Sequence, residues 1–367
     1  MFKISLFDKY IFKQVFVATF VCLLLFIVVW IAPETLVKII KKLFTDVIDI
    51  KQAGLMLLYE LPKVLGKALP VGILLGSIFT FDKLSKDSEL SILRGIGLSF
   101  TRIMLPVIFL GAVLSVFCFY VGDRMIPFAS KAEGENAHFK THFVYIKKDK
   151  DNLPKTGIIV SDFTPNMLKN IVMIDFSKRR YDDAVTFRNI IFSKYATVHD
   201  NKWILHETKK YGINSDGIYN EITHPGEIEI FKEGDDARTV YQLMVDSTKR
   251  DRTFTNLELK NYMKILKEQE FSDEFRFMLS KYYQRFLHPL TCILFAIIGC
   301  LLGFSPPRSQ RLVGFTIAVG IVFAYYITLP FFDLLAQKGV LPPFISSFIP
   351  ILMFIASIVI IKKCKDL

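Results

Sequence analysis

The chain has 367 residues, of which 52% are hydrophobic and 22% are charged, and its formal net charge is +11. A soluble core of this length normally needs less apolar material, so the composition argues against a soluble domain and favours a membrane protein. The positive charge does not indicate nucleic-acid binding, because no basic stretch has interleaved aromatic residues and because lysines commonly flank membrane spans.

Six apolar runs predict membrane spans, since a helix needs about 20 apolar residues to cross a bilayer. Five of them carry no charge: Gln14 to Pro33, Ile103 to Gly122, Phe286 to Pro307, Leu312 to Phe332 and Gly339 to Ile361. The sixth, Ala53 to Phe81, carries Glu60, Lys63 and Lys67 in its first half. The pattern predicts three spans, a long polar segment and three more spans, so that both termini lie on the same side of the membrane.

The first span follows MFKISLFDKY, which lacks the small-residue cleavage site of a signal peptide, so we expect this span to be retained. The five cysteines lie in the spans or near the C-terminus, at Cys22, Cys118, Cys292, Cys300 and Cys364. Because the polar middle segment contains none of them, its fold cannot rely on intramolecular disulfides, even in an oxidising compartment.

The distribution of basic residues predicts cytoplasmic termini, because cytoplasmic loops carry an excess of Lys and Arg. In that orientation the outer loop predicted from Phe331 to Gly339 is nearly uncharged. Lysines at the outer ends of the first two spans break the rule: Lys38, Lys41, Lys42, Lys51, Lys63 and Lys67. One explanation is that these side chains snorkel to the headgroups.

A phosphate-binding patch is the other explanation. Its candidate residues for lipid-phosphate binding are Lys38, Lys41, Lys42, Lys63 and Lys67. The first three cluster within about one helical turn, and the last two share a helix face with Glu60. Charges within a span usually face a protein interior or a water-filled cavity, because exposing them to lipid is costly. Lysine binds phosphate as a point charge, which suits an anionic lipid headgroup.

The polar middle segment, from about Asp123 to Arg252, has strand-like periodicity. Its runs mix β-branched and aromatic residues with polar ones, as in FVYIKK, TGIIVSDF, NIVMIDF, VTFRNIIFSKYATVHDNKWILHETKKYGI and TVYQLMVD. Turn residues such as NSDG and HPGE separate some of these runs. The pattern predicts an antiparallel sandwich or jelly roll. Its histidines lack metal-ligand spacing and no serine-hydrolase motif occurs, so we predict no catalytic or metal site.

A helix is predicted after the β domain. Thr255 and Glu258 have the spacing of a capping box at the start of LELKNYMKILKEQE. This helix leads to FSDEFRFMLSKYYQRFLHPL, where the fourth span begins, so we expect the β domain to connect closely to the membrane helices.

The segment between the second and third spans, Asp82 to Arg102, has the composition of a short amphipathic helix. Ser85 or Asp87 is its predicted cap, and Gly97 is a stop signal. Its apolar face is short and contains Leu90, Ile92, Leu93 and Ile96. Such a helix either lies on the headgroups or docks a cytoplasmic partner through its charged residues Asp87, Glu89 and Arg94.

This segment also resembles a known family. The lipopolysaccharide-export permeases of the LptF/LptG (YjgP/YjgQ) family have a similar second span and loop, which correspond here to ELPKVLGKALPVGILLGSIFTFDKLSKDSELSILRGIGLSFTRIMLP. The matching loop positions are Leu84, Ser85, Asp87, Ser88, Glu89, Leu90, Arg94, Gly97 and Ser99. Later family segments resemble FTNLELKNYMKILKEQ and YYQRFLHPLTCILFAIIGCLLGFSPPR, so the resemblance covers essentially the whole chain.

The resemblance implies an α-helical membrane protein with six transmembrane helices and an inserted periplasmic antiparallel β-jellyroll domain. The implied domains are 1–122 (helices 1 to 3, with a cytoplasmic coupling helix near 84–97), 123–270 (the β-jellyroll and a connecting helix) and 271–367 (helices 4 to 6). The implied location is the bacterial inner membrane, with several passes and both termini in the cytoplasm.

The resemblance further implies a transport permease, the membrane half of an ATP-binding-cassette exporter, and not an enzyme. The residues implied to couple it to an ATPase are Asp87, Glu89, Leu90, Arg94 and Gly97. The implied partners are a second LptF/LptG-type permease, a cytoplasmic ATPase dimer, a periplasmic β-jellyroll bridge protein, a single-span membrane regulator and lipopolysaccharide. Because this chain has no GxxxxGK[ST] loop, we expect ATP and Mg on the separate ATPase and no cofactor here.

Two other classes of function stay open at this point. A secondary transporter would use buried acids or histidines for ion coupling, and the spans offer little beyond Glu60 and His288. A membrane-anchored enzyme or envelope assembly scaffold would use the β domain, and an enzyme would need a clustered acid, base and nucleophile. The resemblance instead favours extraction of lipopolysaccharide from the outer leaflet of the inner membrane and its transfer to a periplasmic bridge.

Overall fold

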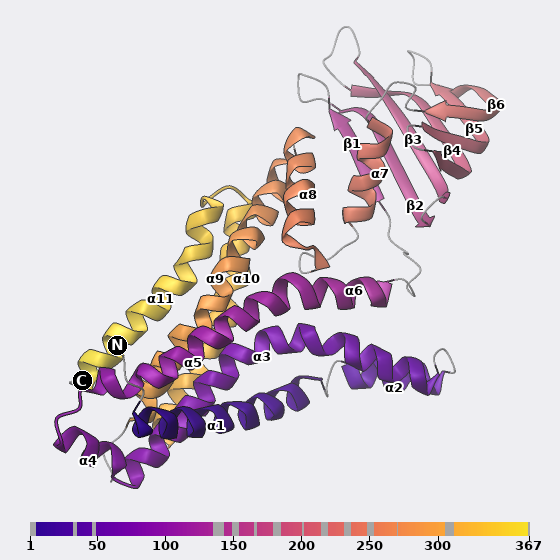
Figure 1. Ribbon diagram of the computed structural model, residues 1–367. Coiled ribbons are helices and arrows are strands. Elements are labelled where there is room, and N and C mark those ends of the chain that lie inside the picture. Colours follow the sequence, from indigo (N-terminus) through magenta and orange to yellow (C-terminus); the bar gives the residue numbers. More distant parts are fainter. Residues whose placement is uncertain are drawn as a thin grey trace. The chain divides into compact units, whose positions relative to one another are not determined.

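The computed structural model divides the chain into two compact units (Figure 1). One contains Met1–Glu133, Asp251–Met263 and Ser272–Leu367 and is helical, and the other contains Gly134–Arg250 and Lys264–Phe271 and holds a β-sheet. The residues that the structure describes are 5–31, 35–45, 49–134, 143–148, 154–164, 167–178, 185–199, 202–213, 219–230, 236–247, 253–269, 271–304 and 312–365.

Within these ranges, six helices are long and apolar enough to cross a membrane. They are α1 (Leu6–Ile31), α3 (Ile50–Lys86), α5 (Phe100–Tyr120), α9 (Ser272–Gly303), α10 (Leu312–Gln337) and α11 (Pro343–Cys364). The predicted order of three spans, a β insertion and three more spans is confirmed. The charged run from Ala53 to Phe81 lies entirely within α3. With six such helices, the chain is a multi-pass membrane protein.

Several spans are longer than the apolar runs that predict them. Helix α5 continues through the π-helical segment η2 (Val121–Met125) into α6 (Ile126–Gly134). Helix α10 continues through Gln337, so most of the outer loop predicted from Phe331 to Gly339 is helical instead. The loop prediction was wrong because polar residues inside the protein, such as Asp333, are compatible with a continuing helix when neighbouring helices satisfy them.

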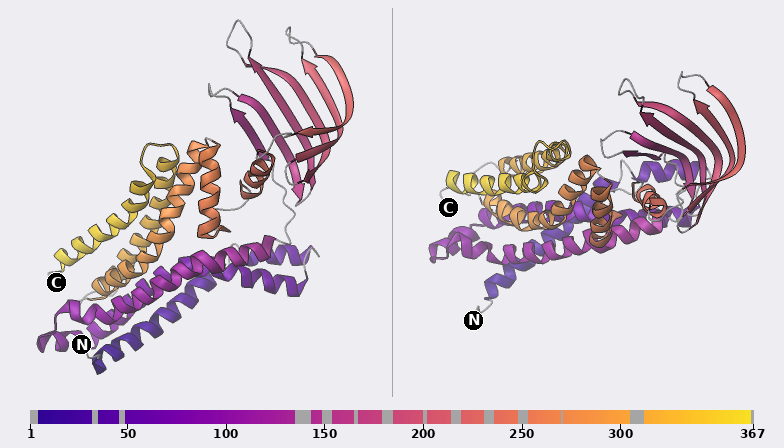
Figure 2. Two further views of the ribbon diagram at one scale, coloured as in Figure 1. Left: turned by 45° about the horizontal axis from the view of Figure 1, so that its top comes forward. Right: turned by 90° about the horizontal axis from the view of Figure 1, so that it is seen from above.

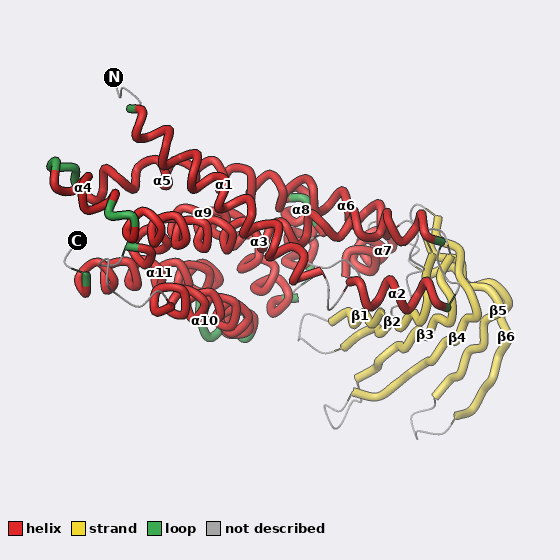
Figure 3. Tube along the Cα trace, turned by 90° about the horizontal axis from the view of Figure 1, so that it is seen from below, coloured by secondary structure: helices red, strands yellow, loops and turns green. Residues whose placement is uncertain are grey.

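Helices α3 and α9 form the centre of the helical unit (Figure 3). Helix α9 contacts α3, α5, α10 and α11, and α3 also packs on α1. Glycines make the closest approach possible, because a Cβ at Gly299 would lie only 2.7 Å from the carbonyl oxygen of Leu74. Gly303 follows four residues later and faces Ile78 in the same way, the small-residue spacing that lets membrane helices pack closely.

The β unit contains one antiparallel sheet, which is strongly curved (Figure 2). Its strands are β1 (Phe143–Lys148), β2 (Pro154–Thr164), β3 (Met167–Lys178), β4 (Val185–His199), β5 (Lys202–Ile213) and β6 (Tyr219–Ile230). The predicted antiparallel β insertion is confirmed. Each described strand pairs with the next in the chain, so these strands form a meander without Greek-key crossovers.

Alternating strand residues build the core of the sheet, including the buried Ile158, Leu168 and Trp203. Helix α7 (Asp236–Ser247) contacts both β1 and β5 and buries Val240 and Met244. The run TVYQLMVD lies in α7, so its assignment as a strand was wrong. Its buried residues recur at the spacing of one helix face, which outweighs the strand preference of individual β-branched residues.

The capping box before α8 (Asn256–Glu268) is confirmed. The backbone N–H of Thr255 donates to Glu258 Oε2 at 2.9 Å, and the N–H of Glu258 donates to Thr255 Oγ1 at 3.3 Å. Lys131 of α6 also donates to Glu258 Oε1, at 2.6 Å. Burial raises the pKa of the Glu258 carboxyl, but the hydrogen bonds from Lys131 and Thr255 outweigh burial and lower this pKa to about 2.

Replacing Glu258 by glutamine is expected to reduce stability at neutral pH by about 1 kcal/mol, because the capping interactions weaken. A carboxyl whose pKa is lowered on folding stabilises the protein above its ordinary pKa of 4.5, and this contribution is lost as the pH falls towards 2. Thermal unfolding in detergent should therefore show a difference between wild type and Glu258→Gln that shrinks across this window. A pH-independent difference, or an equal effect of the exposed control Glu268→Gln, would contradict the assignment.

Candidate functional site

The five candidate lysines belong to two separate groups. Helix α2 (Val37–Phe44) carries Lys38, Lys41 and Lys42 between α1 and α3. Helix α2 is amphipathic, with Ile39 buried and the side chains of Lys41 and Lys42 exposed, whereas the side chain of Lys38 lies outside the described residues. A basic amphipathic helix of this kind suits the membrane interface.

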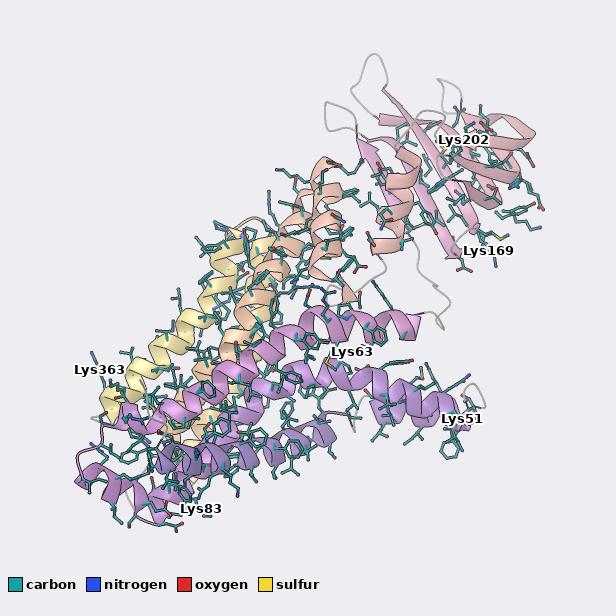
Figure 4. The ribbon with its side chains drawn as sticks, viewed as in Figure 1. Lys51, Lys63, Lys83, Lys169, Lys202 and Lys363 are labelled. Carbon is teal, nitrogen blue, oxygen red and sulfur yellow. The ribbon has the colours of Figure 1, made fainter. Side chains whose placement is uncertain are left out.

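The second group, Lys63 and Lys67, lies on α3 and lines a cavity of about 150 Å³. Figure 4 shows Lys63 part-way along α3, between Lys51 at one end and Lys83 towards the other. The walls come from seven helical elements and the start of α8: α3, α5, η2, the start of α6, α9, α10 and α11. The same cavity is lined by Lys281 and Arg285 of α9, so its charged groups come from both central helices.

Each of these cations contacts a neighbouring group. The Lys63 ammonium lies 2.9 Å from Glu60 Oε2, which is the i, i+3 pair expected on one helix face. Lys67 Nζ lies 4.7 Å from the ring centroid of Trp30 of α1, a cation–π contact. Arg285 Nη1 donates to Asn256 Oδ1 at 3.1 Å, which ties α9 to the first residue of α8.

A proline in α3 affects the hydrogen bonding of Gly66, a residue that lines this cavity. Pro70 has no N–H, so the carbonyl of Gly66 lacks its usual intrahelical donor. His288 Nε2 lies 3.2 Å from this carbonyl oxygen, and His288 Nδ1 lies 2.9 Å from the Tyr325 hydroxyl. In the neutral ring Nε2 donates to Gly66 and Nδ1 accepts from Tyr325, so the imidazole links α3, α9 and α10. These two contacts give His288 a structural role in the bundle.

The predicted coupling segment folds into α4 (Glu89–Gly95), a shorter helix than the one expected near 84–97. The prediction of Ser85 or Asp87 as the cap was wrong: the N-cap residue is Ser88, which has a φ of 60° and makes no side-chain cap hydrogen bond. Ser85 cannot serve because α3 continues through Lys86. Gly97 does mark the end, with a φ of +89° that favours glycine.

The side chains of α4 divide into an anchoring set and an exposed set. Leu90 is fully buried in the helical core, so it anchors α4 to the bundle. Ile92 and Ile96 are 63% and 72% exposed and form a small apolar surface. Glu89 Oε1 accepts a hydrogen bond from the Tyr10 hydroxyl at 3.2 Å, and Arg94 lies over the ring of Phe304 at 5.5 Å. Asp87 and Gly97 are exposed.

Comparison with protein families adds the deciding observation. A sequence model described as "Lipopolysaccharide export system permease LptF/LptG" matches residues 9–363. The chain belongs to this family. A search of curated proteins found no match. The family match runs from α1 to α11 and includes the inserted sheet, so the whole architecture is that of an LptF/LptG permease.

The interior of this LptF/LptG permease contains a polar network that the sequence did not indicate. Asp333 of α10 is 2% exposed and accepts hydrogen bonds from Ser280 at 2.9 Å, Lys281 at 2.5 Å and Gln284 at 2.6 Å. Ser347 of α11 joins it by donating to the carbonyl of Ser280 at 3.1 Å. The available signal was the i, i+1, i+4 spacing of the three donors on α9, but their acceptor is about 50 residues away in sequence.

Proposed function

We propose that the chain is the permease subunit of an ATP-binding-cassette exporter that extracts lipopolysaccharide from the outer leaflet of the bacterial inner membrane. The observation that carries this proposal is the family match over residues 9–363 of a chain with six apolar helices and a β insertion. Two permeases pair to enclose the lipid, and a separate ATPase dimer supplies the energy. The transported lipid then passes to a periplasmic β-jellyroll bridge protein.

The proposed orientation has both termini and α4 in the cytoplasm and the sheet in the periplasm. The basic residues of the inside segments support it through the positive-inside rule. Helix α4 is then the contact for the ATPase: Leu90 fixes the helix to the bundle, while Ile92, Ile96 and the charge of Glu89 face the partner. ATP-driven closure of the dimer moves the permease through this helix.

The lipid is held by its two chemically different ends. Lys38, Lys41 and Lys42 of α2 attract phosphates at the level of the headgroups. The acyl chains pack on apolar helix faces, such as the exposed face of α1 that contains Phe16, Phe20 and Leu24. Lys63 and Lys67 were predicted for the same patch as the α2 lysines. They line a cavity instead, so the proposed phosphate contact at the headgroups is assigned to the lysines of α2 alone.

The β unit transfers the lipid to the periplasmic bridge protein. Strands β1 and β6 are the outer strands of the described sheet, and an outer strand can pair with a strand of another β domain. A jelly-roll bridge protein that adds to this sheet would continue the curved apolar surface outward. A single-span membrane regulator is a further proposed partner.

Native mass spectrometry of the tagged protein, gently solubilised from its own membrane, tests the proposal. We expect an ATPase dimer, a second permease and a bound phosphorylated glycolipid to copurify. Reversal of two charges on α2, Lys41→Glu with Lys42→Glu, should reduce the glycolipid and leave the protein partners in place. A lone protein that carries ordinary phospholipids in several detergents would instead favour a transporter or scaffold.

A further inference from the structure

Two cysteine thiols contact each other inside the helical unit, one on α5 and one on α9. Cys118 is 3% exposed and Cys292 is fully buried. The Cys292 thiol hydrogen bonds to the sulfur of Cys118, and both side chains pack with Leu69 of α3 in one cluster. The proposed export function uses neither thiol. Their contact joins residues that lie on opposite sides of the β insertion in the sequence.

The helices that carry these thiols pack closely. A Cβ at Gly111 of α5 would lie 3.1 Å from the Cβ of Ala296 and 3.2 Å from the carbonyl oxygen of Cys292. Cys118 follows Gly111 by about two helical turns, so both lie on the face of α5 that contacts α9. The close approach matters because a disulfide joins Cα atoms that are only about 4.4–6.8 Å apart.

Polar groups surround the sulfur of Cys118. Its thiol donates to the carbonyl oxygen of Gly66 at 3.7 Å. The His288 ring, whose Nε2 lies 3.2 Å from the same oxygen, also hydrogen bonds to this sulfur. The imidazole and the Cys292 thiol therefore direct hydrogen-bond donors at the atom on which negative charge develops when a thiol acts as a nucleophile. Cys118 is the better placed of the two thiols to react first.

Cys118 is also the more accessible of the two. All five cysteines lie in the part of the chain that the structure describes, and among them Cys118 lines the cavity of about 150 Å³ described above. This volume equals that of roughly five water molecules, at about 30 Å³ each. A hydrogen peroxide molecule, which has one oxygen atom more than water, fits this space. Cys292 contacts Cys118 but does not line the cavity.

We propose that Cys118 and Cys292 form a disulfide in response to peroxide, with Cys118 oxidised first and Cys292 as the resolving cysteine. The Cys118 sulfur attacks one oxygen of hydrogen peroxide and the O–O bond breaks, which gives a sulfenic acid and one water molecule. The Cys292 sulfur then attacks the sulfur of the sulfenic acid, so that the S–S bond forms and a second water molecule leaves. In total, the thiols lose two hydrogens and two electrons, and peroxide is reduced to water.

The disulfide has a direct structural consequence. It joins α5 to α9 covalently, and so connects the spans before the β insertion to those after it. These two helices can then no longer separate at this level, and the Cys118 thiol no longer donates to the Gly66 carbonyl. The site lies within one chain. It goes beyond the proposed export function and does not depend on a second permease, an ATPase or transport.

Thiol counting in the purified full-length protein in mild detergent tests the proposal. The exposed Cys364 is first replaced by serine to prevent disulfides between molecules, which leaves four of the five thiols. After treatment with hydrogen peroxide, we expect alkylation of the denatured protein to label two thiols instead of four, and reduction with dithiothreitol to restore all four. Mass spectrometry of the unreduced digest should identify peptides joined through Cys118 and Cys292.

Single replacements in this background assign the role of each thiol. With Cys292→Ser, peroxide should form no disulfide, and dimedone, which reacts with sulfenic acids, should label Cys118. With Cys118→Ser, we expect neither a disulfide nor dimedone labelling of Cys292, because Cys292 does not line the cavity. The matched control Cys300→Ser replaces another fully buried thiol of α9 and should leave the disulfide between Cys118 and Cys292 unchanged.

Some results would overturn the proposal. Four free thiols after peroxide treatment would exclude the site, as would a disulfide that still forms when Cys118 or Cys292 is replaced. Dimedone labelling of Cys292 in Cys118→Ser would contradict the assigned order of reaction. If a variant of the pair does not fold, the unreduced digest of the Cys364→Ser protein decides alone, because both thiols are present there. Failure of the export function leaves all of these thiol counts unchanged, so the two proposals can fail independently.

Discussion

Charge reversal at Glu89 is expected to abolish ATPase association, or the coupling of ATP hydrolysis to transport, while the permease still folds. Glu89 begins α4, and its carboxylate accepts a 3.2 Å hydrogen bond from the Tyr10 hydroxyl of α1. Its loss removes little from the bundle, because Leu90 holds α4 in place. A lysine at this position would reverse the charge that α4 presents to the ATPase and would lose the favourable interaction with the helix N-terminus.

Copurification of the ATPase and its hydrolysis rate with Glu89→Lys measure this effect. The control Glu268→Lys reverses an exposed glutamate elsewhere and should leave both unchanged. Tyr10→Phe removes the hydrogen bond but keeps the charge, so it separates the positioning of Glu89 from its contact with the partner. Normal lipid transport by Glu89→Lys would contradict the assignment of Glu89 to ATPase coupling.

Replacement of Asp333 by asparagine is expected to destabilise the helical unit by about 3 kcal/mol. Its carboxylate accepts from Ser280, Lys281 and Gln284 of α9, and 4% of its side chain is exposed. An amide of the same size cannot balance the Lys281 charge, and an uncompensated charge in a buried pair costs about 3–5 kcal/mol. Thermal or denaturant unfolding in detergent should show the loss.

A matched control and a rescue test the cause of this loss. Asp273→Asn changes an exposed acid at the start of α9 and should alter stability by no more than about 0.5 kcal/mol. The double variant Asp333→Asn with Lys281→Met removes both charges but keeps an amide oxygen that accepts from Ser280 and Gln284, so it should recover most of the stability. Equal losses in the single and double variants would indicate a packing effect instead.

The architecture could be predicted from the sequence because its signals are local. Uncharged runs of about 20 residues indicate spans wherever they occur. The β-branched and aromatic residues of NIVMIDF and the capping box at Thr255 are likewise complete within a few residues. The family resemblance used equally local patterns and is confirmed by the match over residues 9–363. Two predictions were wrong, the helix cap at Ser85 and the strand at TVYQLMVD, which lies in α7. In both cases a short sequence pattern is compatible with two structures, and the packing of the folded chain decides between them.

The cavity could not be predicted in this way. Its walls combine Lys67, Asp123, Arg285 and Tyr325, which are brought together only when α3 and α9 pack through Gly299 and Gly303. Asp333 was expected in a loop, and its three partners were expected only to lie in the segment that leads into the fourth span. Pro70 was visible in the sequence, but two groups that contact the Gly66 carbonyl, the Cys118 thiol and the His288 ring, lie much later in the chain.

The meander of the β unit bears on how the chain is made. Every described strand pairs with its neighbour in sequence, so the sheet has low contact order and its hairpins can form one after another. No described strand pairing requires a residue from α9, α10 or α11. We therefore expect the sheet to begin folding during synthesis, before the last three spans are complete, so that few unpaired strands are exposed to aggregation while the membrane helices assemble.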